Sequence, residues 1–212
     1  MSDLGDLRNE FTKSTLSEEQ LLADPMAMFQ RWFNEYRATP PQEPTAMTVA
    51  TVDAQQHPWQ RILLLKGLDE KGFTFFTNMN SNKGQHLVNN PYGSLHFFWL
   101  ELERQVQVQG KIEKISREES LHYFQSRPKE SQLGALASKQ SQPLENRQAM
   151  EAKFKQLQKE YCNSQVPMPD NWGGYRLIPE RLEFWQGGAH RLHDRFEYQL
   201  RAGLWTNRRL YP

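Results

Sequence analysis

Short apolar segments separated by turn residues fill the chain from residue 45 to residue 115. The pattern is typical of β-strands, and turns such as Asp69-Glu70-Lys71-Gly72 divide them. Regular spacing of short strands favours an antiparallel barrel over a doubly wound parallel sheet. The expected strands are Thr45 to Val52, Trp59 to Lys66, Phe73 to Thr77, Gly93 to Trp99 and Arg104 to Ile115, with a short helix from Lys83 to Asn89.

A helix is expected before these strands. Asp24 and Pro25 supply an N-cap and a first-turn proline, and an aromatic stripe at helical spacing follows. Residues 1–23 are polar and weakly periodic, so they are expected to form a mobile arm. No repeat or linker divides the rest, and we expect one domain from 24 to 212. The stripe, expected to pack into the core, consists of Phe29, Trp32, Phe33 and Tyr36.

Helices also follow the strand region. The capping-box spacing that begins at Ser116 predicts a helix with Tyr123 and Arg127 on one face, which Pro128 ends or kinks. A second, polar helix is expected from Leu144 to about Tyr161. From Trp172 onward the pattern returns to strands, the last of them Leu204 to Leu210.

Charge and composition exclude several classes of protein. The formal net charge is +1, so no broad field indicates a nucleic-acid or membrane partner. One cysteine, Cys162, cannot form an intrachain disulfide, and neither a secretory signal nor an apolar span of ~20 residues is present. We therefore expect a soluble cytoplasmic protein. No G-x-G-x-x-G motif follows a strand, and His190 and His193 alone are too few for a metal site.

The segment from Gly187 to Arg195 holds two histidines and two arginines. If this segment is extended, Arg191, His193 and Arg195 share one face, because strand side chains alternate. Such a face would suit an anionic, planar ligand. The alternative is an edge strand whose charges simply face solvent.

Two further groups of side chains could bind anions. Arg61 and Lys66 flank an apolar run, and their odd separation would direct them to opposite faces of a strand, one anion on each side. The alternative is that both are ordinary cations at strand ends. Tyr123, Arg127 and Ser131 could converge with Lys66 on a second phosphate, although by themselves they also fit an ordinary end of an amphipathic helix.

Six motifs, in order along nearly the whole chain, resemble the pyridoxamine 5'-phosphate oxidase family. These motifs are Pro44 to Met47, Gln60 to Lys66, Leu102 to Val106, Tyr123 to Pro128, Ser138 to Ser141 and Glu183 to Gly188, followed by the segment ending at Arg195. The resemblance implies a split β-barrel with flanking helices that binds flavin mononucleotide (FMN). It implies a homodimer with the flavin between subunits. It also implies oxidation of pyridoxamine or pyridoxine 5'-phosphate by O2, giving pyridoxal 5'-phosphate and H2O2.

The resemblance also implies roles for individual residues. Arg191 and His193 correspond to residues over the substrate ring and are the catalytic candidates. The substrate-binding candidates are Arg8, Lys66, Tyr123, Arg127, Ser131, Arg191, Leu192 and His193. The cofactor-binding candidates are Arg61, Ile62, Leu63, Leu64, Leu65, Lys66, Phe76, Thr77, Asn82, Lys83, Gln105, Gln140, Ser141, Trp185 and Arg195.

The chain departs from the family pattern at a few positions. Asn82 replaces an arginine beside the lysine that contacts cofactor phosphate, and Asn9 and Phe11 replace an arginine and a tyrosine of the N-terminal arm. Ala189 replaces a residue that is often acidic or polar. Two alternatives remain open. One is a related flavin oxidase acting on another planar substrate, such as a phenazine precursor, and the other is a non-catalytic carrier of FMN or pyridoxal phosphate.

Overall fold

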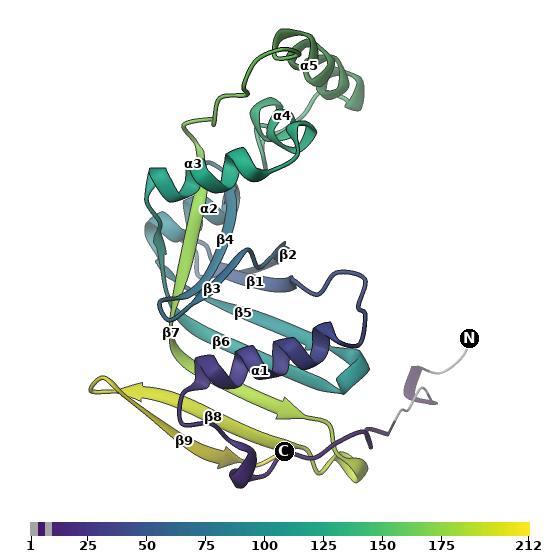
Figure 1. Cartoon of the computed structure of the whole chain (residues 1–212), viewed down its shortest axis with the longest axis vertical. Helices are drawn as coiled ribbons and strands as arrows, with labels where there is room; N and C mark the ends of the chain where they lie inside the picture. Colours follow the sequence, from purple (N-terminus) through teal and green to yellow (C-terminus); the bar gives the residue numbers. More distant parts are fainter. Residues whose placement is uncertain (1–3, 7–9) are drawn as a thin grey trace.

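An antiparallel sheet of nine strands forms the frame of the molecule, in the order β2-β1-β5-β6-β7-β4-β3 with β8 and β9 added beside β7 (Figure 1). The computed structural model describes residues 4–6 and 10–212. The strands are β1 (Ala46–Val52), β2 (Pro58–Leu64), β3 (Gly67–Asp69), β4 (Gly72–Asn78), β5 (Tyr92–Trp99), β6 (Arg104–Lys114), β7 (Trp172–Gln186), β8 (Asp194–Arg201) and β9 (Leu204–Leu210). The sheet curls into a half-barrel, which confirms the β-dominated fold that the strand spacing predicted.

Helices flank the sheet at its face and at one end. They are α1 (Pro25–Arg37), α2 (Asn82–Asn89), α3 (Arg117–Ser126), α4 (Lys129–Ala137) and α5 (Arg147–Glu160), with short 3-10 turns η1 (Leu4–Asp6), η2 (Glu18–Gln20), η3 (Leu100–Leu102) and η4 (Ala189–Arg191). Among the described residues, no helix is long and apolar enough to cross a lipid bilayer.

Strand β7 is the longest strand and joins the two ends of the molecule. Its first half, from Trp172 to Leu177, pairs with β4, and its second half, from Arg181 to Gln186, pairs with β8. Strand β6 pairs with β7 along most of its length, with a register shift between Gln109 and Gly110. Side chains at the two ends of β7 therefore face different parts of the protein.

The main core lies between α1 and the sheet. Asp24 caps α1 by accepting hydrogen bonds from the backbone of Met26 and Ala27, as the sequence predicted. Phe29 and Trp32 are buried and make edge-to-face contacts with aromatic side chains of the sheet. Burial of each such side chain stabilises the fold by roughly 1.5–3 kcal/mol. The aromatic stripe therefore determines where α1 lies.

A second, smaller core joins α3, α4 and α5 to the start of β7. Phe124, Leu133, Leu157 and Trp172 are its buried centre. Helix α4 was not expected, because Pro128 was interpreted only as the end of a helix. In the structure Pro128 occupies the N-cap position, with the new helix starting at the next residue. Proline is favourable at a helix start because its missing N–H would have no partner there.

The N-terminal segment contacts the body of the protein from residue 10 onward, where the Glu10 carboxylate lies 3.4 Å from His190 Nδ1. The backbone of Lys13 donates to the Glu103 carboxylate, and that of Leu16 donates to Asp194. Arg209 pairs with both Glu18 and Asp194. The division into a mobile arm and a single domain stays a prediction.

Candidate active site

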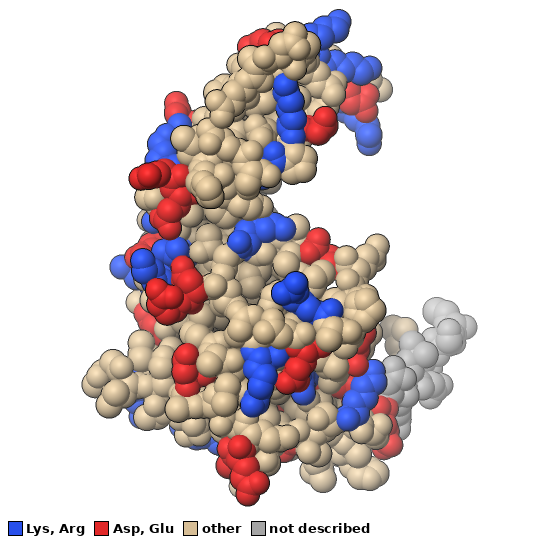
Figure 2. Space-filling view, in the orientation of Figure 1, with Lys and Arg blue, Asp and Glu red and all other residues tan. Residues whose placement is uncertain are grey.

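A pocket of about 650 Å³ opens between β2, β4 and the helices α3 and α4. Figure 2 shows the molecule hollowed between the helical end and the strands, with Lys and Arg side chains on both rims. Ten of the predicted site residues line this pocket: Ile62, Leu63, Leu64, Lys66, Phe76, Thr77, Tyr123, Arg127, Ser131 and Gln140. The fold thus brings together side chains that lie far apart in the sequence.

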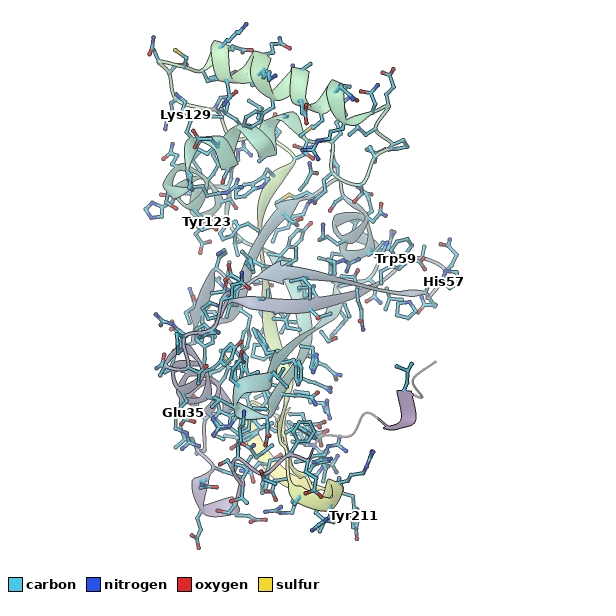
Figure 3. The ribbon with its side chains drawn as sticks, turned by 90° about the vertical axis from the view of Figure 1, so that its right-hand side faces the viewer. Glu35, His57, Trp59, Tyr123, Lys129 and Tyr211 are labelled. Carbon is cyan, nitrogen blue, oxygen red and sulfur yellow. The ribbon has the colours of Figure 1, made fainter. Side chains whose placement is uncertain are left out.

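Aromatic rings form one wall of the pocket. Tyr123 stacks on Phe76 with ring centroids 3.9 Å apart, and Trp172 continues the stack at 5.5 Å from Phe76. Burial raises the pKa of the Tyr123 phenol, so the phenol keeps its proton and can donate a hydrogen bond. Figure 3 shows Tyr123 on α3 at the helical end of the molecule. This wall offers a flat apolar surface with one donor.

The Arg127 guanidinium lies in the same wall without an ionic partner in the described part of the chain. It stands 5.0 Å over the Trp172 ring and 5.7 Å over Phe124, and its buried Nη1 atom has no hydrogen-bond partner. A buried unpaired donor costs about 1–3 kcal/mol. An anionic ligand that accepted this hydrogen bond would offset that cost.

Two expectations about local structure are wrong here. Helix α3 ends at Ser126, and Arg127 is its extended C-cap residue, so Tyr123 and Arg127 meet in the pocket without sharing a helix face. Strand β2 ends at Leu64, so Lys66 lies beyond it and strand alternation cannot relate it to Arg61. The backbone N–H of Lys66 instead donates to the Thr74 carbonyl of β4, and this bond holds Lys66 beside the pocket.

A second cationic cluster lies beside this pocket. The Lys83 ammonium donates to Thr77 Oγ1 (3.1 Å), Ser81 Oγ (3.1 Å) and Gln140 Oε1 (2.9 Å). Burial, together with the nearby Arg61 charge, lowers the pKa of Lys83 to about 8. In the described ranges no carboxylate lies within salt-bridge distance of Arg61 or Lys83. One buried and one partly buried cation without a counter-ion fit a doubly negative phosphate.

Other predicted cofactor residues of this region differ in their surroundings. Leu65 is buried in the core, and Asn82 is exposed at the start of α2. Ser141 is exposed and has a positive φ of 70°. None of the three lines the pocket. Their contacts with a cofactor stay predictions.

The C-terminal candidates lie elsewhere. The segment Gly187 to His193 is not extended, because η4 turns it and both His190 and Arg191 have positive φ. The prediction that Arg191, His193 and Arg195 share a strand face is therefore wrong. Arg191 and Leu192 are exposed on this turn, while His193 is partly buried.

His193 is held by its backbone and aromatic neighbours. Its Nδ1 accepts a hydrogen bond from the Gly188 N–H over 3.1 Å, so Nε2 carries the proton of the neutral ring. Burial and the Arg191 charge lower the pKa of His193, which favours this neutral form. Trp185 packs against His193 with centroids 4.6 Å apart, and Phe11 contacts both rings.

Arg195 and Gln105 lie beside Trp185 at a smaller hollow of about 230 Å³. Arg195 pairs with the buried carboxylate of Glu183 at 2.8 Å, and Gln105 Oε1 lies 2.9 Å from His96 Nε2. The hollow therefore has one fixed cation and one fixed amide on its rim.

A single chain does not bring the two groups of candidates together. Trp172 lines the large pocket and Trp185 the small hollow, 13 residues apart on β7. At about 3.3 Å per residue this is roughly 40 Å along the strand. Figure 1 shows β7 running from α3 to the turn that leads into β8. Arg8 and Asn9 lie outside the described residues.

Several residues of the pocket were not predicted from the sequence. Trp172 was interpreted only as the start of a strand, although its ring continues the aromatic wall. Asn78, Ser138, Gly134 and Ala135 also line the pocket. Gly134 and Ala135 lie on α4, so recognising Pro128 as a helix start would have placed them near Arg127 and Ser131.

Comparison with known proteins adds family relationships. A family model described as "Pyridoxamine 5'-phosphate oxidase" matches residues 34–161, and one described as "Pyridoxine 5'-phosphate oxidase C-terminal dimerisation region" matches residues 172–212. A protein named pyridoxine/pyridoxamine 5'-phosphate oxidase from Pseudomonas putida (strain W619) is 49% identical over 99% of this chain and 98% of its own. One of the same name from Shewanella amazonensis (strain ATCC BAA-1098 / SB2B) is 50% identical over the full length of both chains.

Solved structures show the same fold. The chain matches PhzG from Burkholderia lata 383, whose structure holds tetrahydrophenazine-1-carboxylic acid, with a TM-score of 0.90, 26% identity and coverage of 95% and 99% of the two chains. A pyridoxamine 5'-phosphate oxidase-related, FMN-binding protein from Nostoc punctiforme PCC 73102 matches with a TM-score of 0.72 at 16% identity, over 90% and 98% of the chains. These likenesses confirm the predicted split-barrel fold.

Proposed function

The chain belongs to the pyridoxamine 5'-phosphate oxidase family, and on that premise we propose that it oxidises pyridoxamine or pyridoxine 5'-phosphate to pyridoxal 5'-phosphate. The observation that carries the proposal is a pair of adjoining cationic sites whose cations have no carboxylate at salt-bridge distance among the described residues. Arg61 and Lys83 form one site, and Lys66 and Arg127 form the other. Thr77 and Gln140 connect them, because both line the pocket and both bind Lys83.

The first cationic site fits the phosphate of FMN. Arg61 and Lys83 would hold this phosphate, with Thr77 and Gln140 as neutral partners beside it. When bound there, FMN would supply the redox chemistry: acceptance of a hydride equivalent from the substrate's C4' carbon and reoxidation by O2, giving H2O2. The chain itself orients the two ligands and excludes water from the space between them.

The second cationic site fits the phosphate of the substrate. Lys66, Tyr123, Arg127 and Ser131 each present a donor at the large pocket. A substrate without phosphate would leave the buried Nη1 of Arg127 unpaired, at a cost of about 1–3 kcal/mol. This disfavours a phenazine precursor as the substrate, although PhzG has the same fold.

We propose that two copies of the chain complete each site as a homodimer. The matched C-terminal dimerisation region contains Trp185, Arg191, His193 and Arg195, which one chain holds far from its own pocket. Ile62 and Phe98 are apolar side chains that are 64% and 51% exposed, and a second copy would cover them. A two-fold arrangement then supplies the C-terminal residues of each chain to the other's pocket.

In that assembly His193 would donate its Nε2–H to a polar substituent of the substrate ring. The hydrogen bond from Gly188 fixes this tautomer, and Trp185 fixes the plane of the ring. Arg191, exposed in the single chain, would hold a second substituent. A cytoplasmic location stays a prediction from the sequence.

The test uses the purified full-length protein. We expect bound yellow flavin, bleaching of its absorbance when pyridoxine 5'-phosphate is added without oxygen, and peroxide when oxygen returns. Unphosphorylated pyridoxine is the matched control and should react far more slowly, because the second cationic site then has no anion. A protein that binds FMN without bleaching would be a carrier, and one that bleaches equally with both substrates would contradict the phosphate site.

A further inference from the structure

A chain of hydrogen bonds lies behind Arg61, and the proposed reaction does not use its last member. Arg61 Nη1 donates to Thr51 Oγ1 over 2.8 Å, and Thr51 Oγ1 lies 2.9 Å from His86 Nδ1. Thr51 is 1% exposed and His86 is 8% exposed. Strand β1 carries Thr51, β2 carries Arg61 and α2 carries His86, so the bonds join three elements.

The direction of these bonds follows from the donors available. A guanidinium can only donate, so Thr51 accepts from Arg61 and its single hydroxyl hydrogen is free for His86. The hydroxyl oxygen could also accept from His86, but among the described residues no other acceptor lies within hydrogen-bond distance of its buried hydrogen, so that hydrogen goes to His86 Nδ1, which then carries no proton. Burial and the Arg61 charge lower the pKa of His86, Asp53 opposes this shift, and Lys83 adds to it. The neutral ring with its proton on Nε2 completes the chain.

This chain fixes one edge of the Arg61 guanidinium. Besides Thr51, Nη1 donates to the backbone carbonyls of Val49 (3.2 Å) and Trp59 (3.1 Å). No hydrogen bond within the described residues engages Nε or Nη2, so the opposite edge is left for a ligand. A planar guanidinium fixed on one edge presents the other edge in a fixed direction.

His86 is itself held in place. The Trp59 ring contacts it edge-on with centroids 5.6 Å apart, and Figure 3 shows Trp59 beside α2. The same helix carries Lys83, three residues earlier. Helix α2 therefore contributes Lys83 directly to the first cationic site and His86 indirectly, through Thr51.

Building on the proposed function, we propose that His86 is a positioning residue for the cofactor phosphate and that it acts through Thr51 on Arg61. Loss of the Nδ1 acceptor leaves the buried Thr51 hydroxyl without an acceptor. The hydroxyl then competes for the backbone carbonyls around Nη1, and Arg61 loses its fixed orientation. The effect should be specific to the phosphate, because the proposed function assigns Arg61 to that group of the flavin.

The experiment measures the affinity of the full-length protein for FMN and for riboflavin, which lacks the phosphate, by flavin fluorescence. We expect His86→Leu to bind FMN about tenfold more weakly, equivalent to about 1.4 kcal/mol, with riboflavin affinity unchanged. His86→Asn should restore most FMN affinity, because Asn Oδ1 occupies nearly the position of His Nδ1. His122→Leu, at an exposed histidine of α3, is the control and should match the wild type.

A double variant tests the route through Thr51. Thr51→Val should weaken FMN binding, Thr51→Ser should retain it, and Thr51→Val with His86→Leu should be no weaker than Thr51→Val alone. If His86→Leu fails to fold, the FMN affinities of Thr51→Val, Thr51→Ser and His86→Asn still test the proposal. The proposal would be overturned if His86→Leu lost equal affinity for FMN and for riboflavin, or if it bound FMN as tightly as the wild type. It would also be overturned if the losses of FMN affinity in Thr51→Val and His86→Leu added up in the double variant. A wild-type protein that does not prefer FMN to riboflavin would instead overturn the proposed function.

Discussion

Replacing Arg127 by Met should weaken substrate binding without destabilising the ligand-free protein. The guanidinium Nη1 is buried and has no partner among the described residues, so the fold carries a donor that a ligand's phosphate can satisfy. A charge-assisted hydrogen bond to phosphate is worth about 1.5–3 kcal/mol, so losing one or two of them costs about 3 kcal/mol, roughly a hundredfold in kcat/KM. Since substrate and transition state carry the same phosphate, the loss should appear in KM.

The effect on stability has two opposing parts. Removing the unpaired donor relieves about 1–3 kcal/mol, and losing the contact with the Trp172 ring, 5.0 Å away, costs about 0.5–2 kcal/mol. We therefore expect an unfolding free energy that is unchanged or slightly higher, with Tm within a few degrees of the wild type.

Steady-state kinetics with pyridoxine 5'-phosphate and thermal unfolding of the flavin-free protein would measure the two effects. Arg117→Met is the matched control, because Arg117 lies on α3 and its ion pair with Asp170 is exposed. It should leave KM unchanged. A KM for Arg127→Met within threefold of the wild type, or a loss of more than 2 kcal/mol in stability, would refute the reasoning.

Three other predictions concern the remaining residues. The pKa of Lys83, lowered to about 8 in the folded protein, means that the unfolded chain binds more protons between about pH 8 and 10.5. Stability of the flavin-free protein should therefore rise across that window, and Lys83→Met should lack this rise in denaturant titrations. His193→Asn keeps an acceptor for the Gly188 N–H but loses Nε2–H, so kcat should fall by roughly a hundredfold with FMN still bound, as stopped-flow and flavin absorbance would show. Lys66→Met and His193→Ala chains should each have little activity when assayed at substrate concentrations well below KM. Mixed subunits that reassemble should regain about a quarter of wild-type activity in that assay, because half of the dimers would then contain one intact site. No gain on mixing would contradict a site shared between chains.

The sequence predicted the local structure well where the signal is local. The strand periods, the Asp24 cap and the aromatic stripe of α1 depend on neighbouring residues, and the structure confirms them. The predictions were wrong where the end of a strand or the start of a helix depended on contacts with residues distant in the sequence. β2 ends at Leu64 because the backbone of Lys66 pairs with Thr74, and Pro128 starts a helix whose Leu133 packs in the second core.

The properties of the candidate site also fall into those that the sequence determines and those that depend on the tertiary structure. The residue types that bind anions, and the family to which the chain belongs, are evident from the sequence. Only the tertiary structure shows that Lys66, Tyr123 and Arg127 share one pocket while His193 lies at the far end of β7. The physical reason is that side-chain chemistry belongs to each residue, whereas burial, counter-ions and separation depend on how the sheet curls. The unpaired Nη1 of Arg127 and the bonds joining Arg61 to His86 exist only in the folded chain.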